Sequence, residues 1–448
     1  MQQPKALNTN DAPWPSTAVA WYGVAVLFIA YTFSFADRFI LSLLIQPIKA
    51  DLALSDTKVS LLHGLAFAIF YTFMGIPIGR LADRFSRRKI VAAGVTVWSL
   101  MTALCGIAQG YWQLFAARVG VGVGEGALSP AAYSMIADSF PQQKLGRALS
   151  AYTTGAFVGI GLAYIIGGKV IGAITVSPEI TLPIVGTIRS WQAAFFIVGL
   201  PGLIVAALMF TVREPLRRIS AAAAADAGDL VPLATVMRFI WNRRQVYVPF
   251  FIGFAVLAVV SNGIFSWTPT FLNRSFGMTL GESGPAIGVI VLTFGTGGLI
   301  TGGWLTDRWS RQGLADSGLR AGIVAGLGGV PFAILLPLMT TETSVLMAYC
   351  PLIFFSTFGF GAAAAALQHV TPNRMRGLTS AIYLFFVNLI GLGLGPTFVA
   401  LITDYGFKDE SAVGFSIAIV AAGSGLLAAI ILWLGLKHFR AEAATQQG

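Results

Sequence analysis

Twelve long runs of apolar residues limit what this chain can fold into. Hydrophobic types make up 56% of the 448 residues and charged types only 11%, whereas about 25% of a soluble domain is charged. A run of about 20 apolar residues is long enough for a helix that crosses a bilayer. The sequence therefore predicts an all-α membrane protein and disfavours a soluble helical protein with an unusual core. The runs cover residues 17–47, 59–82, 90–109, 111–138, 147–175, 192–212, 246–272, 283–306, 321–341, 343–369, 377–403 and 411–437.

An internal repeat divides these twelve predicted spans into two sets of six. The stretch GRLADRFSRRK from residue 79 is echoed by GWLTDRWSR from residue 303, a shift of 224 residues. Internal repeats of this kind build many transporter folds. The sequence predicts a tail at 1–16, a six-helix half at 17–212, a central loop at 213–245, a second half at 246–437 related to the first by pseudo-symmetry, and a tail at 438–448. The repeated positions are Gly79, Leu81, Asp83, Arg84, Ser86 and Arg87, matched by Gly303, Leu305, Asp307, Arg308, Ser310 and Arg311.

Basic residues are sorted between alternate loops, which predicts the orientation. With the N-terminus in the cytoplasm, the cytoplasmic segments carry 20 of the 29 Lys and Arg residues and the opposite face carries six. The positive-inside rule therefore predicts that both termini are cytoplasmic. The net charge of +10 follows from this topology and does not indicate nucleic-acid binding. The chain is expected in a bacterial inner membrane.

The chain shows no pattern typical of a catalytic or metal site. Cys105 and Cys350 lie inside apolar runs of opposite halves, and the three histidines form no ligand cluster. The stretch GGKV at 167–170 has Val where a phosphate-binding loop needs Ser or Thr. We therefore expect no enzyme activity, no cofactor and no metal, and any transport must be driven by a gradient or by the substrate itself.

The stretch GRLADRFSRRK resembles the G-x-L-a-D-R-x-G-R-[RK]-[RK] signature of the major facilitator superfamily, with Ser86 in place of the usual Gly. The echo from residue 303 falls where that family has its second copy. The resemblance covers essentially the whole chain. It implies alternating access, with gating roles for the repeated positions Gly79, Asp83, Arg84, Arg87, Gly303, Asp307, Arg308 and Arg311. We expect Asp83 and Asp307 to help close the cytoplasmic side in the outward-facing state.

A narrower resemblance lies in ARVGVGVGEGALSPAAYSMIADSFP at 117–141, together with FADR at 35–38 and VWSLMTAL at 97–104. These stretches are similar to the Spinster-like branch, which is associated with export of lysophospholipids and sphingoid phosphates. The superfamily's antiporter motif in span five has Gly-Pro where this chain has Ala163 and Tyr164. Antiport is therefore not supported by that motif.

Four charged residues in the predicted spans need explaining: Asp37 and Arg38 in the first, Arg118 and Glu125 in the fourth. Each costs at least about 2.5–3.5 kcal/mol at the centre of a membrane helix, so they should face a cavity or one another. Arg118 and Glu125 are seven residues apart, about 10.5 Å along a helix, which is too far for a direct pair. Each therefore needs another partner, which span one offers. A static charge cluster joining the two spans is the alternative to a functional site.

The second half differs, because 246–272 and 378–403 carry no acidic or basic side chain. One charged and one apolar cavity wall suit an amphiphile with an anionic head, and they suit a small aromatic acid equally. We predict Arg118, and after it Arg38, as substrate-binding residues, with Glu125, or else Asp37, carrying a coupled proton.

The predicted function is a proton-coupled secondary transporter of an amphipathic or anionic organic substrate such as a lysophospholipid or sphingoid phosphate. A small organic anion symporter, a multidrug exporter and a non-transporting membrane receptor or sensor are the alternatives. Membrane lipids, the substrate and protons are the expected partners, and the protein is expected to be a monomer.

Overall fold

The computed structural model describes residues 13–174, 179–182, 186–217 and 232–447. The first part of the chain forms α1 (Thr17–Leu52), α2 (Asp56–His63), α3 (Leu65–Arg84), α4 (Arg87–Cys105), α5 (Tyr111–Glu125), α6 (Leu128–Ser139), α7 (Gln142–Ile174), β1 (Glu179–Leu182), β2 (Gly186–Arg189), α8 (Ser190–Gly199) and α9 (Gly202–Met209). The second part forms α11 (Leu233–Asn242), α12 (Arg244–Phe276), α13 (Leu280–Ile290), η1 (Val291–Gly295), α14 (Thr296–Arg311), α15 (Ser317–Leu335), η2 (Leu336–Leu338), α16 (Glu342–Phe358), α17 (Phe360–Val370), η3 (Asn373–Met375), α18 (Arg376–Phe386), η4 (Val387–Leu394), α19 (Gly395–Leu401), η5 (Ile402–Phe407), η6 (Glu410–Ala412) and α20 (Val413–Gln447).

Each predicted apolar run coincides with one helix or with consecutive helical segments. Within the described residues, eleven such stretches are long and apolar enough to cross a membrane. The remaining run, 111–138, is divided into α5 and α6 at Gly126 and Ala127, directly after Glu125. The predicted all-α membrane protein is confirmed.

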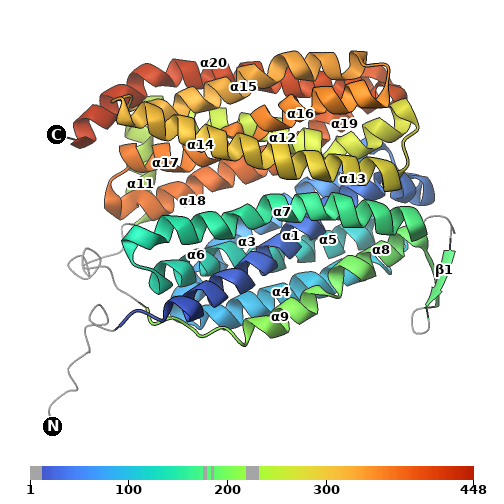
Figure 1. The fold of residues 1–448 in the computed structure, drawn as a ribbon, viewed down its shortest axis with the longest axis horizontal. Coiled ribbons are helices and arrows are strands. Elements are labelled where there is room, and N and C mark those ends of the chain that lie inside the picture. Colours follow the sequence, from blue (N-terminus) through green and yellow to red (C-terminus); the bar gives the residue numbers. More distant parts are fainter. Residues whose placement is uncertain (1–12, 175–178, 183–185, 218–231, 448) are drawn as a thin grey trace, which may run out of the picture.

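The two halves of the chain form two layers of helices, and the helix axes of both layers are roughly aligned with one another (Figure 1). Helices α1 to α9 make one layer and α12 to α20 the other. The described chain begins and ends at one end of the bundle, which we call the termini end. The antiparallel pair β1 and β2 lies at the opposite end, which we call the hairpin end.

The central loop contains the short helix α11. Two features were not expected from the sequence. The β1–β2 hairpin joins spans five and six, with Glu179 paired to Arg189. The segment from residue 438, expected to be a tail, continues α20 as far as Gln447. Residues 1–12 and 218–231 of the predicted tail and central loop lie outside the described residues.

The halves pack most closely near the hairpin end. One buried cluster there contains residues of both, including Leu44 and Tyr164 of the first half and Trp267 and Phe271 of the second. Two other buried clusters lie almost entirely within single halves. Glycine permits the close contacts: a Cβ atom at Gly64 would lie 2.5 Å from the Gly393 carbonyl oxygen.

A second close contact joins α7 to α13. A Cβ atom at Gly168 would lie 2.8 Å from Gly284 Cα. The Tyr164 hydroxyl also crosses between the halves and donates a hydrogen bond to the Phe265 carbonyl oxygen. Tyr164, one of the two residues that depart from the antiporter motif, therefore helps to hold the two halves together.

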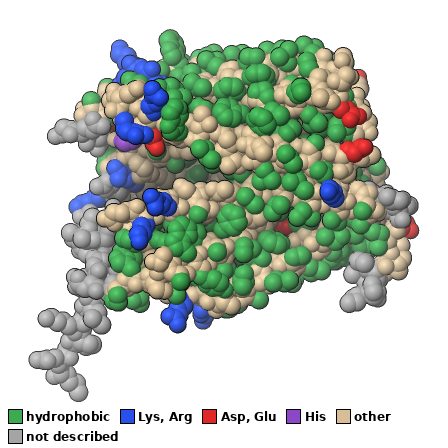
Figure 2. Space-filling model, viewed as in Figure 1, with side chains coloured by type: hydrophobic (Ala, Val, Ile, Leu, Met, Phe, Trp, Pro, Cys, Tyr) green, Lys and Arg blue, Asp and Glu red, His purple; other side chains and the backbone are tan. Residues whose placement is uncertain are grey.

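The molecular surface matches a membrane span with one basic end. Figure 2 shows apolar side chains over most of the visible face, with Lys and Arg gathered at the termini end and acidic residues at the hairpin end. The exposed apolar residues include Ile204 on α9, Ile300 on α14 and Trp433 on α20. An apolar surface of this size is expected where lipid, and not water, surrounds the helices.

Candidate functional site

The centre of the first half contains a buried ion pair between α1 and α5. Arg38 Nε donates to Glu125 Oε2 at 2.6 Å, and Ser34 Oγ donates to the same oxygen at 2.5 Å. Glu125 is 1% exposed and Arg38 is 7% exposed. The expected partner of Glu125 on span one is thus Arg38, and Ser34 lies one helical turn before it.

Aromatic rings surround the Arg38 guanidinium group. Its central carbon lies 4.6 Å from the ring centroid of Phe35, 4.7 Å from that of Phe67 and 4.5 Å from that of Tyr71. Cation–π contacts of this length stabilise a desolvated cation by about 2 kcal/mol or more. The rings therefore contribute to holding the guanidinium group in place, in addition to its ion pair with Glu125.

Only one of the two carboxylate oxygens of Glu125 accepts hydrogen bonds from the described residues. Its Oε1 atom is buried and has no hydrogen-bond partner among the described residues, while Oε2 accepts two hydrogen bonds. A buried carboxylate oxygen without a donor is costly, and the oxygen can accept a proton without breaking either bond to Oε2. This geometry suits a carboxyl group that changes its protonation state.

Arg118 differs from Arg38 because no carboxylate pairs with it in the described part of the chain. It is 0% exposed, its Nε donates one long hydrogen bond of 3.5 Å to the Leu62 carbonyl oxygen, and neither terminal nitrogen has a partner there. Its guanidinium carbon lies 5.6 Å from the centroid of Phe67. The Phe67 ring therefore contacts both arginines, and Arg118 retains two unused donors.

Asp37 lies next to Arg38 in sequence but contacts a different helix. Thr102 Oγ1 on α4 donates to Asp37 Oδ2 at 3.2 Å, and Oδ1 has no partner among the described residues. His63 at the end of α2 is also buried, with Nδ1 unpartnered in the same sense. The structure thus brings together Arg38 and Glu125, whereas neither Asp37 nor Arg118 forms a direct ion pair with any residue that the structure describes.

Sequence reasoning missed Ser34, Tyr71, Thr102 and His63. Ser34 had a signal, since a residue four positions before Arg38 shares its helix face. Tyr71, Thr102 and His63 had none, because their roles depend on how α3, α4 and α2 pack against α1 and α5.

In the first copy of the signature, from residue 79, the Arg87 side chain forms ion pairs with neighbouring segments of the chain. The Arg87 side chain is 1% exposed and pairs with Asp138 at the end of α6 and with Glu214, whose Oε1 lies 2.9 Å from Nε. Glu214 also accepts from the Ser86 hydroxyl at 2.7 Å and from the Arg88 backbone N–H at 2.9 Å. It therefore caps the positive N-terminus of α4.

Ser86, where the family usually has Gly, is the N-cap residue of α4, with φ −61° and ψ 116°. No left-handed backbone is needed there, so the substitution is tolerated.

Burial alone raises the pKa of Glu214, but hydrogen bonds from Ser86, Arg88 and Arg87 outweigh it and hold the pKa below its ordinary value.

The second signature copy does not form the same contacts. Arg311 is exposed and its Nε donates to the carbonyl oxygen of Asp307 at 3.3 Å. The Arg308 guanidinium carbon lies 5.5 Å from the Trp304 ring centroid. In the first copy, Arg84 is exposed and the Asp83 side chain lies outside the described residues.

The signature glycines are not close-packed in this conformation. A Cβ atom at Gly79 would lie 3.8 Å from Pro130 Cβ, an ordinary contact, and one at Gly303 would meet nothing within 4 Å. The physical reason is that the halves are joined at the other end of the bundle.

An ion network at the hairpin end joins the two halves. Asp56 is 0% exposed and accepts from Lys49 Nζ at 2.6 Å and from Arg274 Nη1 and Nη2 at 2.6 and 2.7 Å. Glu410 lies 2.7 Å from Lys49 and 3.2 Å from Arg274. Nearby, Asp404 Oδ2 accepts from both the backbone N–H and the hydroxyl of Thr57, at 2.7 and 2.6 Å.

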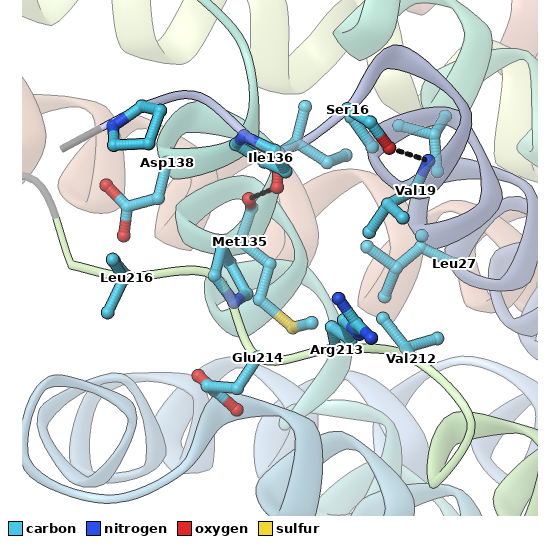
Figure 3. Close-up of a pocket in the computed structure, with 17 residues that line it drawn as sticks. Ser16, Val19, Leu27, Met135, Ile136, Asp138, Val212, Arg213, Glu214 and Leu216 are labelled. Atoms are coloured by element: carbon cyan, nitrogen blue, oxygen red, sulfur yellow. Dashed lines mark hydrogen bonds between the residues drawn. The ribbon is translucent and has the colours of Figure 1, made fainter.

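A cavity of about 330 Å³ opens at the termini end of the first half (Figure 3). Apolar side chains such as Leu27, Met135 and Val212 form part of its wall, with Arg213 and Glu214 among its polar lining residues. It does not contain Arg38 or Glu125. We therefore regard the buried pair, and not this cavity, as the centre of the candidate site.

Comparison with known proteins identifies the family. Residues 27–396 match the Major Facilitator Superfamily. The chain is 30% identical to an MFS-type efflux pump of Mycolicibacterium smegmatis, over 98% of this chain and 97% of that protein. It is 26% identical to protein spinster homolog 1 of Xenopus tropicalis, over 94% of this chain and 82% of that protein.

The fold agrees with these relatives. A crystal structure of a bacterial homolog of the human lysosomal transporter Spinster, in an inward-facing and unoccupied conformation, superimposes with a TM-score of 0.76. That protein is 26% identical to this one, and the match covers 96% of this chain and 98% of the other. The chain therefore belongs to the Major Facilitator Superfamily of membrane transporters, in its Spinster-like branch.

Proposed function

We propose that this transporter moves an anionic, amphipathic organic substrate together with a proton by alternating access. The observation that carries the proposal is the buried Arg38–Glu125 pair, in which the carboxylate keeps one oxygen free and the arginine is held by three aromatic rings. An ion pair in this position can exchange one partner for a substrate and a proton.

Charge balance links the two events. Before a substrate binds, Arg38 neutralises Glu125, and removing either partner at this depth would be strongly unfavourable. A substrate anion that binds the arginine leaves Glu125 without its counter-ion, and uptake of one proton by Glu125 restores neutrality. Arg118 provides two unpartnered donors on the other side of Phe67, which suits a phosphate or carboxylate bound through two parallel hydrogen bonds.

The rest of the site favours an amphiphile. Phe73 on α3 is exposed and its ring lies 5.4 Å from Phe385 on α18 of the other half. The second half contributes no charged side chain between residues 378 and 403. An anionic head near the arginines and an apolar tail against the second half would satisfy both walls, as in a lysophospholipid or a sphingoid phosphate.

The proposed orientation follows from the basic termini end. With both termini in the cytoplasm of a bacterial inner membrane, the conformation joined at the hairpin end is the inward-facing one. In the same proposal, the signature residues Asp83 and Asp307 join the halves at the cytoplasmic side when the hairpin end opens. A single chain contains the whole site, so the monomer is the proposed working unit.

The test is transport by purified protein in liposomes. Glu125→Gln should still exchange labelled lysophospholipid across the membrane but should no longer accumulate it in response to a pH gradient. Asp37→Asn serves as the parallel variant, because Asp37 is also buried but has no ion pair with Arg38. Full pH-driven uptake by Glu125→Gln combined with loss in Asp37→Asn would transfer the coupling role to Asp37.

A second variant tests the head-group site. Arg118→Lys keeps the charge but cannot form two parallel hydrogen bonds, so it should impair exchange of a phosphate-bearing substrate strongly. Near-normal exchange would mean that Arg118 serves only to balance charge, and the same substitution at Arg38 should then be the damaging one.

The similarity to an efflux pump favours a second candidate, export of amphipathic drug-like compounds. A panel of lysophospholipids, small organic acids and amphipathic dyes in the same liposomes distinguishes the two. Absence of counterflow for every compound would favour a receptor or sensor on a transporter scaffold.

A further inference from the structure

The short helix α11, between the two halves, has two apolar faces, and only one of them is buried. Val236 and Ile240 are 0% and 8% exposed and belong to the core of the second half. Leu233, Met237 and Trp241, spaced four residues apart, form a second stripe that is exposed. Water alone on this side would not explain a contiguous apolar stripe.

The polar residues of α11 occupy a third face. Helical spacing places Thr235, Arg238 and Asn242 together, on the far side of the exposed stripe from the buried residues. All three are exposed. The order around the helix is therefore core-facing, then exposed apolar, then polar, which is the arrangement of a helix that lies in the interface of a bilayer.

The position of α11 agrees with this arrangement. Figure 1 places α11 at the termini end of the second half. Arg243, which has the non-helical angles φ −112° and ψ 29°, separates α11 from the spanning helix α12, and it pairs with Glu442 near the end of α20 at 2.7 Å. The chain thus turns at the point where the spans meet the membrane surface.

Exposed apolar residues also occur on two of the spanning helices of the second half. Val248, one turn into α12, is exposed, and so are Trp433 and Leu434 on α20. Arg244 lies with its guanidinium carbon 5.9 Å from the Trp241 ring centroid. Tryptophan beside arginine is typical of residues at the level of lipid head groups.

We propose that the stripe of Leu233, Met237 and Trp241 inserts into the lipid leaflet at the termini end, and that Arg238 and Arg244 bind the phosphates of anionic lipids there. The partner is a lipid surface that carries net negative charge, which the two arginines complement. The helix then anchors the link between the two halves to the membrane surface.

Depth measurement on the full-length protein tests the insertion. A nitroxide label is attached at Met237→Cys, with Thr235→Cys on the polar face of the same helix as the matched control, in vesicles containing phosphatidylglycerol. The protein without an added cysteine gives the background from Cys105 and Cys350. The label at 237 should be reached by oxygen, which concentrates in lipid, much more than by a water-soluble nickel chelate, and the label at 235 should show the reverse.

Equal access of the nickel chelate to positions 237 and 235 would place the stripe in water and overturn the proposal. Protection of position 237 from both reagents would show that protein covers the stripe and would also overturn it. For the charge component, Arg238→Gln with Arg244→Gln should make the label at 237 shallower in phosphatidylglycerol vesicles and remove the difference from phosphatidylcholine vesicles. An unchanged lipid dependence would exclude the role of the two arginines.

Discussion

The two ends of the bundle use charge in different ways. At the hairpin end, Asp56 of the first half binds Arg274 of the second, and Lys49 binds Glu410. At the termini end, Arg87 pairs with Asp138 of its own half and with Glu214, which follows α9 at the start of the central loop, and Arg440 on α20 pairs with Asp316 just before α15. The hairpin-end pairs therefore join the two halves in this conformation, whereas the termini-end pairs do not connect one six-helix half to the other.

The largest effect is expected from Asp56→Ala. Loss of this buried carboxylate leaves Lys49 and Arg274 close together, with only the more exposed Glu410 to neutralise them. We expect a destabilisation of this conformation by about 3 kcal/mol, which corresponds to about a hundredfold shift toward opening at the hairpin end. Thiol labelling at Ser42→Cys, a position that is buried here, should rise accordingly.

The matched control for that variant is Asp51→Ala. Asp51 is also an acid at the hairpin end, but it binds Arg189 and Trp191 of its own half. Labelling at position 42 should stay low in this control. Equal labelling in the two variants would mean that the network between the halves does not hold the conformation.

The next effect is expected from Gly64→Ala. The added Cβ would meet the Gly393 and Leu392 carbonyl oxygens at 2.5 and 2.9 Å, so the two halves would have to separate there. Overpacking of this kind costs about 1–3 kcal/mol. Gly75→Ala on α3, the helix that begins directly after Gly64, is the control, because nothing lies within 4 Å of a Cβ atom built there. A higher labelling rate at position 42 in Gly64→Ala alone would support the view that the contact at Gly64 helps to hold the two halves together. Equal rates in the two variants would contradict it.

A smaller effect, on stability and not on conformation, is expected from Glu214→Gln. The carboxylate caps α4 and binds Arg87, and loss of such a cap costs about 1 kcal/mol. The thermal unfolding midpoint should fall, while labelling at position 42 should not change. Arg311→Gln in the second signature copy, where the side chain is exposed, should leave both measurements unaltered.

The lowered pKa of Glu214 predicts that its contribution to the stability of the fold depends on pH. Because the folded-state pKa of Glu214 is lowered, its stabilising contribution is complete above the unfolded pKa of about 4.3. It is lost as the pH falls through the lower folded value. The difference in unfolding midpoint between the wild type and Glu214→Gln should therefore shrink at acidic pH, and a difference that grew instead would contradict the lowered pKa.

The spans could be predicted from sequence because each depends on about 20 neighbouring residues, whatever the rest of the chain does. The pairing of Glu125 with a residue of span one could also be anticipated, since four charges at membrane depth leave few alternatives. The capping of α4 by Glu214 and the Asp56–Arg274 pair could not. They join residues 126 or more positions apart, and only the packing of the helices brings them together. The lack of a carboxylate partner for Arg118 among the described residues could not be predicted either, because the surroundings of this side chain depend on where Leu62 and Phe67 lie.

The smallest effect on this conformation is expected from Gly79→Ala, which sharpens the comparison of the two ends. The added Cβ would make only an ordinary contact of 3.8 Å with Pro130, so the unfolding midpoint and the labelling at position 42 should change by no more than a surface substitution would, within about 0.5 kcal/mol. If the termini end closes in the alternate state, the glycine is needed there, and the same variant should slow substrate exchange in liposomes. Gly377→Ala, near the start of α18 with nothing within 4 Å of its Cβ, is the matched control and should exchange substrate normally. Slow exchange in Gly79→Ala with unchanged stability would mean that the signature acts in the state in which the two halves meet at the termini end, whereas normal exchange would show that close approach at Gly79 is not part of the transport cycle.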